Sequence, residues 1–273
     1  MVNDVAMDSP SSAPVISSTD GGVATITLNA PERKNSLSPV LVNSLADALD
    51  AAIDDPSVRI IVLTNTGNTF CAGADLSSDA PGSQAGGRSF VDLFRIIQAS
   101  PTPVIGRIDG HATGGGVGLA AVCDISVMRD DAKIGFTEVR LGVAPAVISV
   151  VCLPKMRRSD ASELFLTGER FTPERAAEVG LINRAVPPDQ VDATVEAFID
   201  KIVRGGPLAL GAAKELIARV PDMHTADAFE WTAERSAALF RSDEAAAGIA
   251  AFRKRSDAPW IPPGRTTDTP GRA

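Results

Sequence analysis

The sequence predicts an α/β fold that ends in a helical region, and three features of its pattern support this. Short strand-like segments alternate with segments of helical period up to about residue 204, which is typical of α/β domains. Residues 59–64 (RIIVLT) form a continuous apolar run, as expected of a strand covered on both faces. Gly205-Gly206-Pro207 then interrupts the alternation, and only helical patterns follow it.

The first elements have clear sequence boundaries. Residues 23–29 (VATITLN) alternate between apolar and polar side chains, which predicts a half-buried strand. Ser38 and Pro39 predict a helix start, because serine caps the first turn and proline fits the first helical position. Apolar residues then recur at helical spacing as far as Asp55-Pro56. The further predicted elements are strands at 104–108, 125–128 and 182–186 and helices at 208–220, 226–240 and 244–252.

The chain divides into segments of different composition. Residues 1–14 are rich in Ser, Pro and Asp, and residues 77–88 are small, polar and glycine-rich, which predicts a loose tail and a mobile surface loop. The predicted segments are a flexible tail (1–14), a core (15–204), a helical region (205–261) and a second flexible tail (262–273).

Composition and charge exclude several classes of function. The 273 residues are 44% hydrophobic, which supplies a sizeable core. The net charge of −8 would repel phosphate backbones and argues against nucleic acid as a partner. No apolar run reaches the ~18 residues of a membrane span, and Asp4 and Asp8 stand where a signal peptide would need positive charge. We therefore expect a cytoplasmic protein with no membrane contact.

The cysteines and histidines indicate neither a disulfide framework nor a metal site. Three widely spaced cysteines suit a reducing compartment, and His111 and His224 lack the spacing of metal ligands. The cysteines are Cys71, Cys123 and Cys152.

Four motifs carry the candidate chemistry. In chain order they are TFCAGADL at 69–76, GHATGGGVGL at 110–119, GFTEVRLG at 135–142 and AFRKR at 251–255. Small residues after a strand leave backbone N–H groups open to a ligand, and three glycines at a helix start add the positive end of the helix dipole. Two N–H groups aimed at one oxygen form an oxyanion hole, in which each donor contributes about 3–4 kcal/mol. A thioester carbonyl suits such a site, because its α-carbanion places negative charge on that oxygen.

Together the motifs resemble the enoyl-CoA hydratase/isomerase (crotonase) family from about residue 15 to residue 260. The resemblance implies a crotonase-like spiral of ββα units, with a CoA-thioester site in the core (15–204). It also implies that the helical region (205–261) forms trimers, or hexamers of two trimers. Neither a metal nor a cofactor beyond the coenzyme A of the substrate is implied.

The resemblance also assigns residues to the site. The two oxyanion donors are the backbone N–H groups of Ala74 and Gly115, and Arg33 resembles a basic residue that meets the CoA phosphates. Ala72 and Asp75 resemble positions whose backbone contacts the adenine. The other substrate-binding positions that the resemblance implies are Leu76, Gly114 and Gly118.

At one phosphate-binding position this sequence departs from the pattern of the family. The lysine often found two residues after the aspartate is Ser77 here. Lys254 or Arg255 in the last motif would supply positive charge instead, including to a neighbouring subunit.

Glu138 is the one carboxylate at a family catalytic position. Two-glutamate hydratases carry another glutamate where this chain has Gly118, and dienoyl isomerases carry acidic residues where it has Gly118 and Ala146. The dienoyl isomerase branch is therefore disfavoured. PAVIS at 145–149 is similar to hydratases that handle branched acyl groups, such as methylglutaconyl-type thioesters.

Three functions remain open at this point. The first is a hydratase that adds water to a 2-enoyl-CoA thioester, including branched ones, through an oxyanion-stabilised enolate. The second is a Δ3,Δ2-enoyl-CoA isomerase, in which Glu138 moves a proton between C2 and C4. The third is an acyl-CoA-binding protein whose catalysis has become weak because a second glutamate is missing.

Overall fold

The computed structural model describes residues 13–76, 87–263 and 265. The predicted loop at 77–88 and the predicted tails at 1–14 and 262–273 fall largely outside these residues. In the described part of the chain, no helix combines the length and apolarity that crossing a membrane requires.

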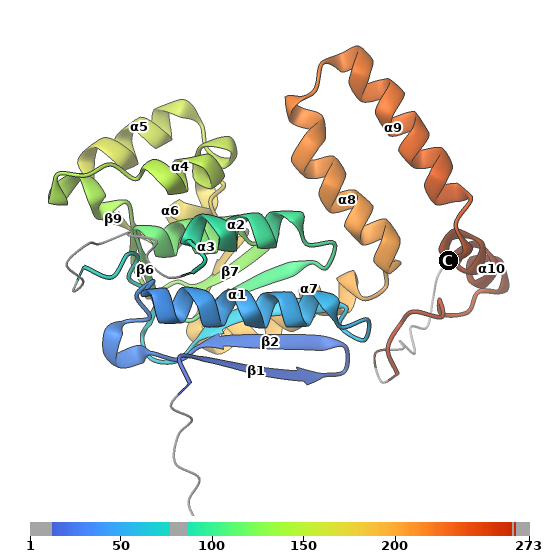
Figure 1. Ribbon diagram of the computed structural model, residues 1–273, viewed down its shortest axis with the longest axis horizontal. Coiled ribbons are helices and arrows are strands. Elements are labelled where there is room, and N and C mark those ends of the chain that lie inside the picture. Colours follow the sequence, from blue (N-terminus) through green and yellow to red (C-terminus); the bar gives the residue numbers. More distant parts are fainter. Residues whose placement is uncertain (1–12, 77–86, 264, 266–273) are drawn as a thin grey trace, which may run out of the picture.

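A six-stranded sheet forms the body of the molecule (Figure 1). Its strand order is β1-β2-β3-β5-β7-β10; β1 pairs antiparallel with β2, and the other neighbours are parallel. The strands are β1 (Val15–Asp20), β2 (Val23–Leu28), β3 (Ile60–Asn65), β5 (Val104–Ile108), β7 (Ile125–Arg129) and β10 (Arg184–Val186).

A second, four-stranded sheet carries the functional motifs. Its order is β4-β6-β8-β9, with β9 antiparallel to β8. The strands are β4 (Thr69–Cys71), β6 (His111–Thr113), β8 (Ile134–Gly135) and β9 (Arg170–Phe171). Strands β3, β5 and β7 of the large sheet are each followed directly by a strand of the small sheet, and helices follow the first two of these pairs. This repetition confirms the predicted α/β fold and its spiral of ββα units.

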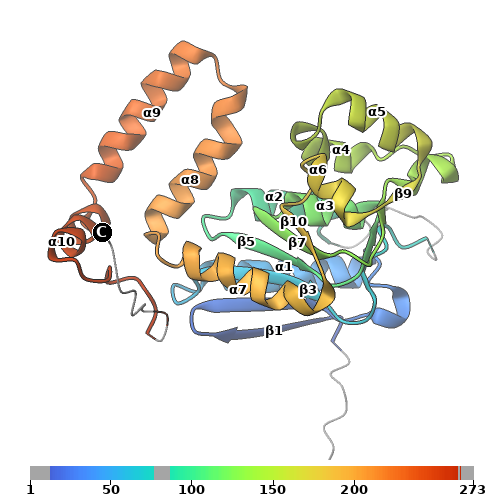
Figure 2. The same cartoon turned by 180° about the vertical axis from the view of Figure 1, so that it is seen from behind.

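Helices cover both faces of the large sheet (Figures 1 and 2). Helix α1 begins as predicted, with the Ser38 hydroxyl accepting a hydrogen bond of 3.3 Å from the N–H of Leu41. The helices of the body are α1 (Pro39–Asp54), α2 (Phe90–Ala99), α3 (Gly115–Val122), α4 (Ala146–Cys152), α5 (Arg158–Thr167), α6 (Pro173–Glu178) and α7 (Val191–Ile202).

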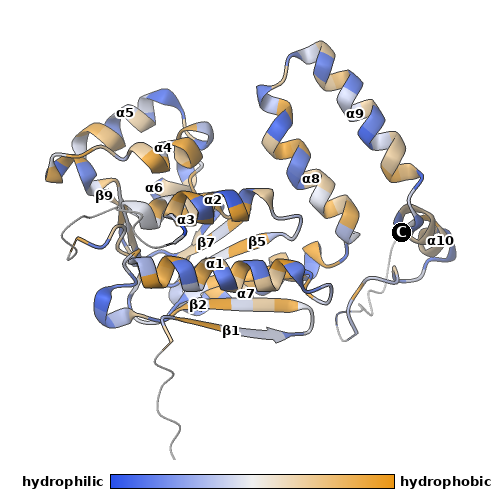
Figure 3. Ribbon diagram, viewed as in Figure 1, coloured by the Kyte–Doolittle hydropathy of each residue, from blue (hydrophilic) through white to orange (hydrophobic). Residues whose placement is uncertain are grey.

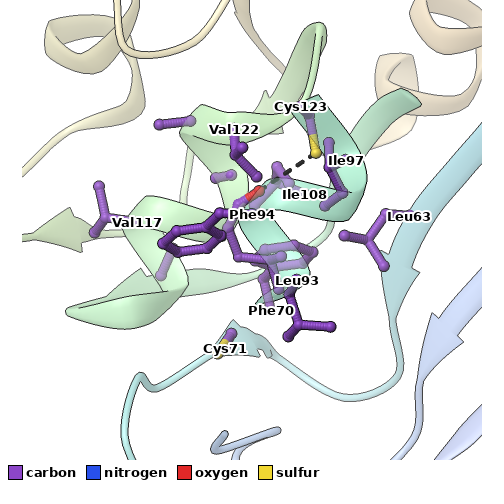
Figure 4. Packing of buried hydrophobic residues seen from close by; sticks show 14 of the residues in the cluster. Leu63, Phe70, Cys71, Leu93, Phe94, Ile97, Ile108, Val117, Val122 and Cys123 are labelled. Carbon is purple, nitrogen blue, oxygen red and sulfur yellow. Dashed lines mark hydrogen bonds between the residues drawn. The ribbon is translucent and has the colours of Figure 1, made fainter. Parts of the chain in front are cut away.

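Strand β3 lies between two hydrophobic clusters. Ile61 and Leu63 belong to the larger cluster with α1, α2 and α3, whereas Ile60 and Val62 pack with the side chains of α7. All six residues of β3 are buried, which confirms the prediction of a strand covered on both faces. Figure 4 shows part of the larger cluster, including the hydrogen bond of 3.3 Å from the Cys123 thiol to the carbonyl of Leu119.

The three helices after Gly206 form an arm. Helix α8 (Pro207–Arg219) contacts the body, because its Lys214 forms an ion pair of 2.7 Å with Asp124 and donates to the carbonyls of Ile97 and Thr102. Helix α9 (Thr225–Phe240) stands further from the body, and α10 (Asp243–Lys254) lies near the end of α9 (Figures 1 and 2). Apolar residues recur along α8 and α9 (Figure 3), yet α9 buries none of its side chains. The large exposed apolar side chains of the arm are Leu208, Ile217, Phe229, Phe240, Ile249 and Phe252.

Two polar contacts hold the base of the arm. The Arg59 guanidinium donates to the carbonyls of Gly205 and Trp260. The Glu244 carboxylate accepts from the N–H groups of Leu208 and Ala209 at 2.9 and 3.0 Å, which satisfies the open N-terminus of α8. The Arg59 contact therefore ties the root of the arm to the body, and the Glu244 contact joins α8 to α10 within the arm.

Candidate active site

The loop after β4 and the start of α3 bring two backbone N–H groups together. A Cβ on Gly73 would lie 2.9 Å from the nitrogen of Gly115, and a Cβ on Gly115 would lie 3.8 Å from the nitrogen of Ala74. Within the described residues, neither of these two N–H groups donates to a protein acceptor. Ala74 and Gly115 therefore present free donors side by side, as an oxyanion hole requires.

Glycines make this approach of the two segments sterically feasible. Gly73 and Gly114 have φ values of 87° and 54°, in the left-handed region that glycine adopts without strain. A Cβ on Gly116 would lie 2.1 Å from the carbonyl oxygen of Cys71, so no other residue fits where α3 meets β4. The helix start then points the positive end of its dipole toward the paired donors.

Glu138 faces the glycine that precedes α3. It lies in a 3-10 helix, η2 (Thr137–Leu141), directly after β8. A Cβ on Gly114 would be 3.4 Å from Glu138 Oε1, which places the carboxylate beside the oxyanion donors. Glu138 Oε2 is buried and has no hydrogen-bond partner among the described residues. Burial raises the pKa of the Glu138 carboxyl above its ordinary value.

Two apolar side chains, Ile148 and Phe94, pack beside Gly118 and form what we call the apolar wall. A Cβ on this glycine would lie 2.5 Å from Ile148 Cγ2 and 2.8 Å from Phe94 Cζ. The two side chains are only 3% and 4% exposed. The space that a side chain at position 118 would need is thus filled by Ile148 from α4 and Phe94 from α2. This contact was not expected from the sequence, since only the tertiary packing brings the two side chains to Gly118.

Three of the predicted CoA-binding residues lie against the same loop. Arg33 forms an ion pair of 2.6 Å with Asp75, and the Arg33 side chain is 51% exposed. The N–H of Ala72 donates to the carbonyl of Lys34 at 3.0 Å. Leu76 is exposed at the end of this loop. The pairing of Arg33 with Asp75 was not expected from the sequence; it fixes the arginine beside the segment that contains the oxyanion donors.

Other predicted residues lie elsewhere. Lys254 is on α10, at the opposite end of the molecule from α3 (Figures 1 and 2), so it does not meet the site within one chain. Ser77 lies outside the described residues. The His111 ring accepts a hydrogen bond of 2.9 Å at Nδ1 from the N–H of Lys133, which gives it a structural role. No group of His, Cys, Asp and Glu side chains among the described residues is arranged to hold a metal ion.

The ββα spiral thus places two paired backbone N–H groups beside the half-buried carboxylate of Glu138. Comparison with known proteins identifies the family. The profile of the enoyl-CoA hydratase/isomerase family matches residues 18–262. The chain therefore belongs to the enoyl-CoA hydratase/isomerase family.

Individual relatives agree with this placement. A Thermus thermophilus protein assigned as an enoyl-CoA hydratase is 36% identical over 239 residues, which cover 85% of this chain and 94% of the relative. The 2,3-dehydroadipyl-CoA hydratase of Escherichia coli is 30% identical over 92% of this chain and 96% of its own. The crystal structure of an enoyl-CoA hydratase from Mycobacterium smegmatis superposes with a TM-score of 0.82 at 30% identity, covering 90% of this chain and 98% of that one.

Proposed function

We propose that this protein adds water to a 2-enoyl-CoA thioester, with Glu138 as its only acid–base residue. The thioester oxygen accepts hydrogen bonds from the N–H groups of Ala74 and Gly115. Glu138 takes a proton from water as the water oxygen bonds to C3, and the electron pair of the C2–C3 double bond moves toward the thioester oxygen. The protonated Glu138 then delivers its proton to C2, which completes the addition of one water molecule.

The observation that carries the proposal is the half-buried Glu138 carboxylate beside two N–H groups that have no acceptor among the described residues. Its Oε2 has no partner among the described residues, so it is open to a water molecule or a substrate proton. Its raised pKa brings the carboxyl closer to neutral pH, where a group that both accepts and donates a proton works best. The hydratase names of the relatives support the same reaction.

The same geometry supports a proposed binding site for the coenzyme A portion of the substrate. Arg33 and the backbone of Ala72 and Asp75 border the loop that carries Ala74, which suits them to bind the coenzyme A portion. No cofactor beyond that coenzyme A takes part in the proposed reaction. Branched acyl groups are included among the substrates.

The apolar wall at Gly118 favours a second candidate, the Δ3,Δ2-enoyl-CoA isomerase. An isomerase needs one carboxylate to move a proton between C2 and C4, and it gains from surroundings that exclude water. Ile148 and Phe94 supply such surroundings at Gly118, one helical turn from Gly114, which faces Glu138.

Two substrates distinguish the candidates. With crotonyl-CoA, a hydratase removes the absorbance of the conjugated thioester. With a 3-enoyl-CoA, an isomerase creates that absorbance. If neither substrate reacts while both bind, the protein is the weakly catalytic acyl-CoA binder.

Assembly as a trimer, or as a hexamer of two trimers, belongs to the same proposal. The exposed apolar side chains of the arm support it, because Ile217, Phe229 and Phe252 are 76%, 74% and 74% exposed in the single chain. In this assembly, 205–261 is the oligomerisation region and Lys254 of one subunit serves a neighbouring site. We place the enzyme in the cytoplasm, consistent with its three free and buried cysteines.

A further inference from the structure

The wall at Gly118 continues the face of α3 that carries the reaction. The N–H of Gly118 donates to the carbonyl of Gly114 at 3.4 Å, so the two glycines are one helical turn apart. A side chain at Gly114 would meet Glu138, and a side chain at Gly118 would meet Ile148 and Phe94. Moving along this face from the Glu138 carboxylate, a substrate therefore reaches Ile148 after one turn, about 5.4 Å.

Helix α4 holds Ile148 firmly in this place. Ile148 is 3% exposed, and its Cγ2 and Cβ atoms would lie 2.5 and 2.9 Å from a Cβ on Gly118. Cys152 lies one turn further along the same helix, where burial raises the pKa of its thiol and the negative charge of Glu138 adds a smaller contribution. Neither Ile148 nor Cys152 adds a charged group to this part of α4.

The direction of the acyl chain follows from the position of the coenzyme A side. This step rests on the proposed function, in which the thioester oxygen lies at Ala74 and Gly115. Residues 33–37 and 72–75 occupy one side of these donors, where the coenzyme A portion binds. The acyl chain must leave on the other side, past Glu138 and toward Ile148.

We propose that Ile148, seated against Gly118 and supported by Phe94, determines the length of acyl group that the enzyme accepts. Carbons beyond the reacting double bond meet its side chain within the length of a few carbon–carbon bonds. The enzyme accordingly prefers short acyl chains, and Ile148 is its specificity-determining residue.

The test compares crotonyl-CoA with 2-octenoyl-CoA as substrates of the Ile148→Ala variant. Removing the side chain opens space at the end of the acyl chain, so the ratio of kcat/KM for octenoyl to crotonyl substrate should rise by about tenfold or more. Val150→Ala is the matched control, because Val150 lies on the same helix but is 69% exposed. Its ratio should equal that of the wild type. If Ile148→Ala does not fold, Ile148→Val should shift the ratio in the same direction by a smaller factor.

An unchanged ratio in a folded Ile148 variant would overturn the inference while leaving the proposed function intact. Binding of butanoyl-CoA and octanoyl-CoA, measured by calorimetry, separates the two ideas if the wild type turns over neither enoyl substrate. The wild type should then bind butanoyl-CoA more tightly than octanoyl-CoA. The Ile148→Ala variant should bind octanoyl-CoA at least as tightly as butanoyl-CoA. If the ratio of the two affinities were the same in the wild type and in Ile148→Ala, the proposed role of Ile148 would be contradicted.

Discussion

Replacing Gly118 with alanine tests how closely α4 packs on α3. The added Cβ would stand 2.5 Å from Ile148 Cγ2 and 2.8 Å from Phe94 Cζ, and real Cβ atoms do not approach other carbons so closely. Both neighbours are buried, so relief requires a shift of α4 or an unfavourable rotamer. Overpacking of this kind costs about 1–3 kcal/mol. Alanine is also the better helix former by about 1 kcal/mol, which offsets part of the cost.

We therefore expect Gly118→Ala to lower the free energy of unfolding by about 1 kcal/mol and the melting temperature by about 2–4 °C. Urea denaturation followed by circular dichroism, at one fixed protein concentration, measures the change. A variant as stable as the wild type, or more stable, would show that α4 does not pack on α3 as closely as the distances indicate.

A double-mutant cycle with Ile148 identifies the contact responsible. Ile148→Ala alone should cost about 2–5 kcal/mol, because it leaves a cavity in a buried wall. In the double variant the methyl group added at position 118 enters that space, so the combined loss should be smaller than the sum by about 1–2 kcal/mol. Additive losses would mean that residues 118 and 148 do not touch.

Three further outcomes are expected. Gly73→Ala should lower turnover about a hundredfold or more in a folded protein, because its Cβ would lie 2.9 Å from the Gly115 nitrogen at a φ of 87°; full activity would refute the oxyanion assignment. Burial raises the folded-state pKa of Glu138 above 4.5, so the folded protein binds the proton more tightly and loses stability as pH rises from 4.5 through the raised value. Glu138→Gln removes this cost, so its advantage in melting temperature should be larger at about pH 8 than at about pH 4, and a pH-independent difference would contradict the burial argument. Sedimentation should give a trimer or hexamer, and a stable monomer at micromolar concentration would exclude the proposed role of the arm.

The large sheet was predictable where its strands have a strong pattern. The first four residues of β3 are a continuous apolar run that suits burial on both faces, and β5 coincides with the predicted residues 104–108. Strand β1 was not predicted, because VISSTD is largely polar and its side chains remain mostly exposed at the edge of the sheet. The strands of the small sheet have only two or three residues each, which is too short for any alternation to be recognised.

The residues of the site were predictable where they belong to local sequence motifs. The glycine motifs placed Ala74, Gly115 and Glu138, and the structure brings all three together. The ion pair of Arg33 with Asp75 joins residues 42 positions apart, and the contact of Ile148 with Gly118 depends on how α4 crosses α3. Neither contact produces a pattern in the local sequence, because long-range packing rather than periodicity brings these residues together.

The most direct test of the account is the turnover of Glu138→Gln on the best 2-enoyl-CoA substrate. Glutamine keeps the shape of the side chain but neither takes nor gives the proton. Because general acid–base catalysis contributes about 10²–10⁴-fold, kcat should fall by that factor. KM should change little, since backbone groups and the coenzyme A contacts supply most of the binding. An unchanged kcat in the folded variant would contradict the central claim that Glu138 carries the proton chemistry.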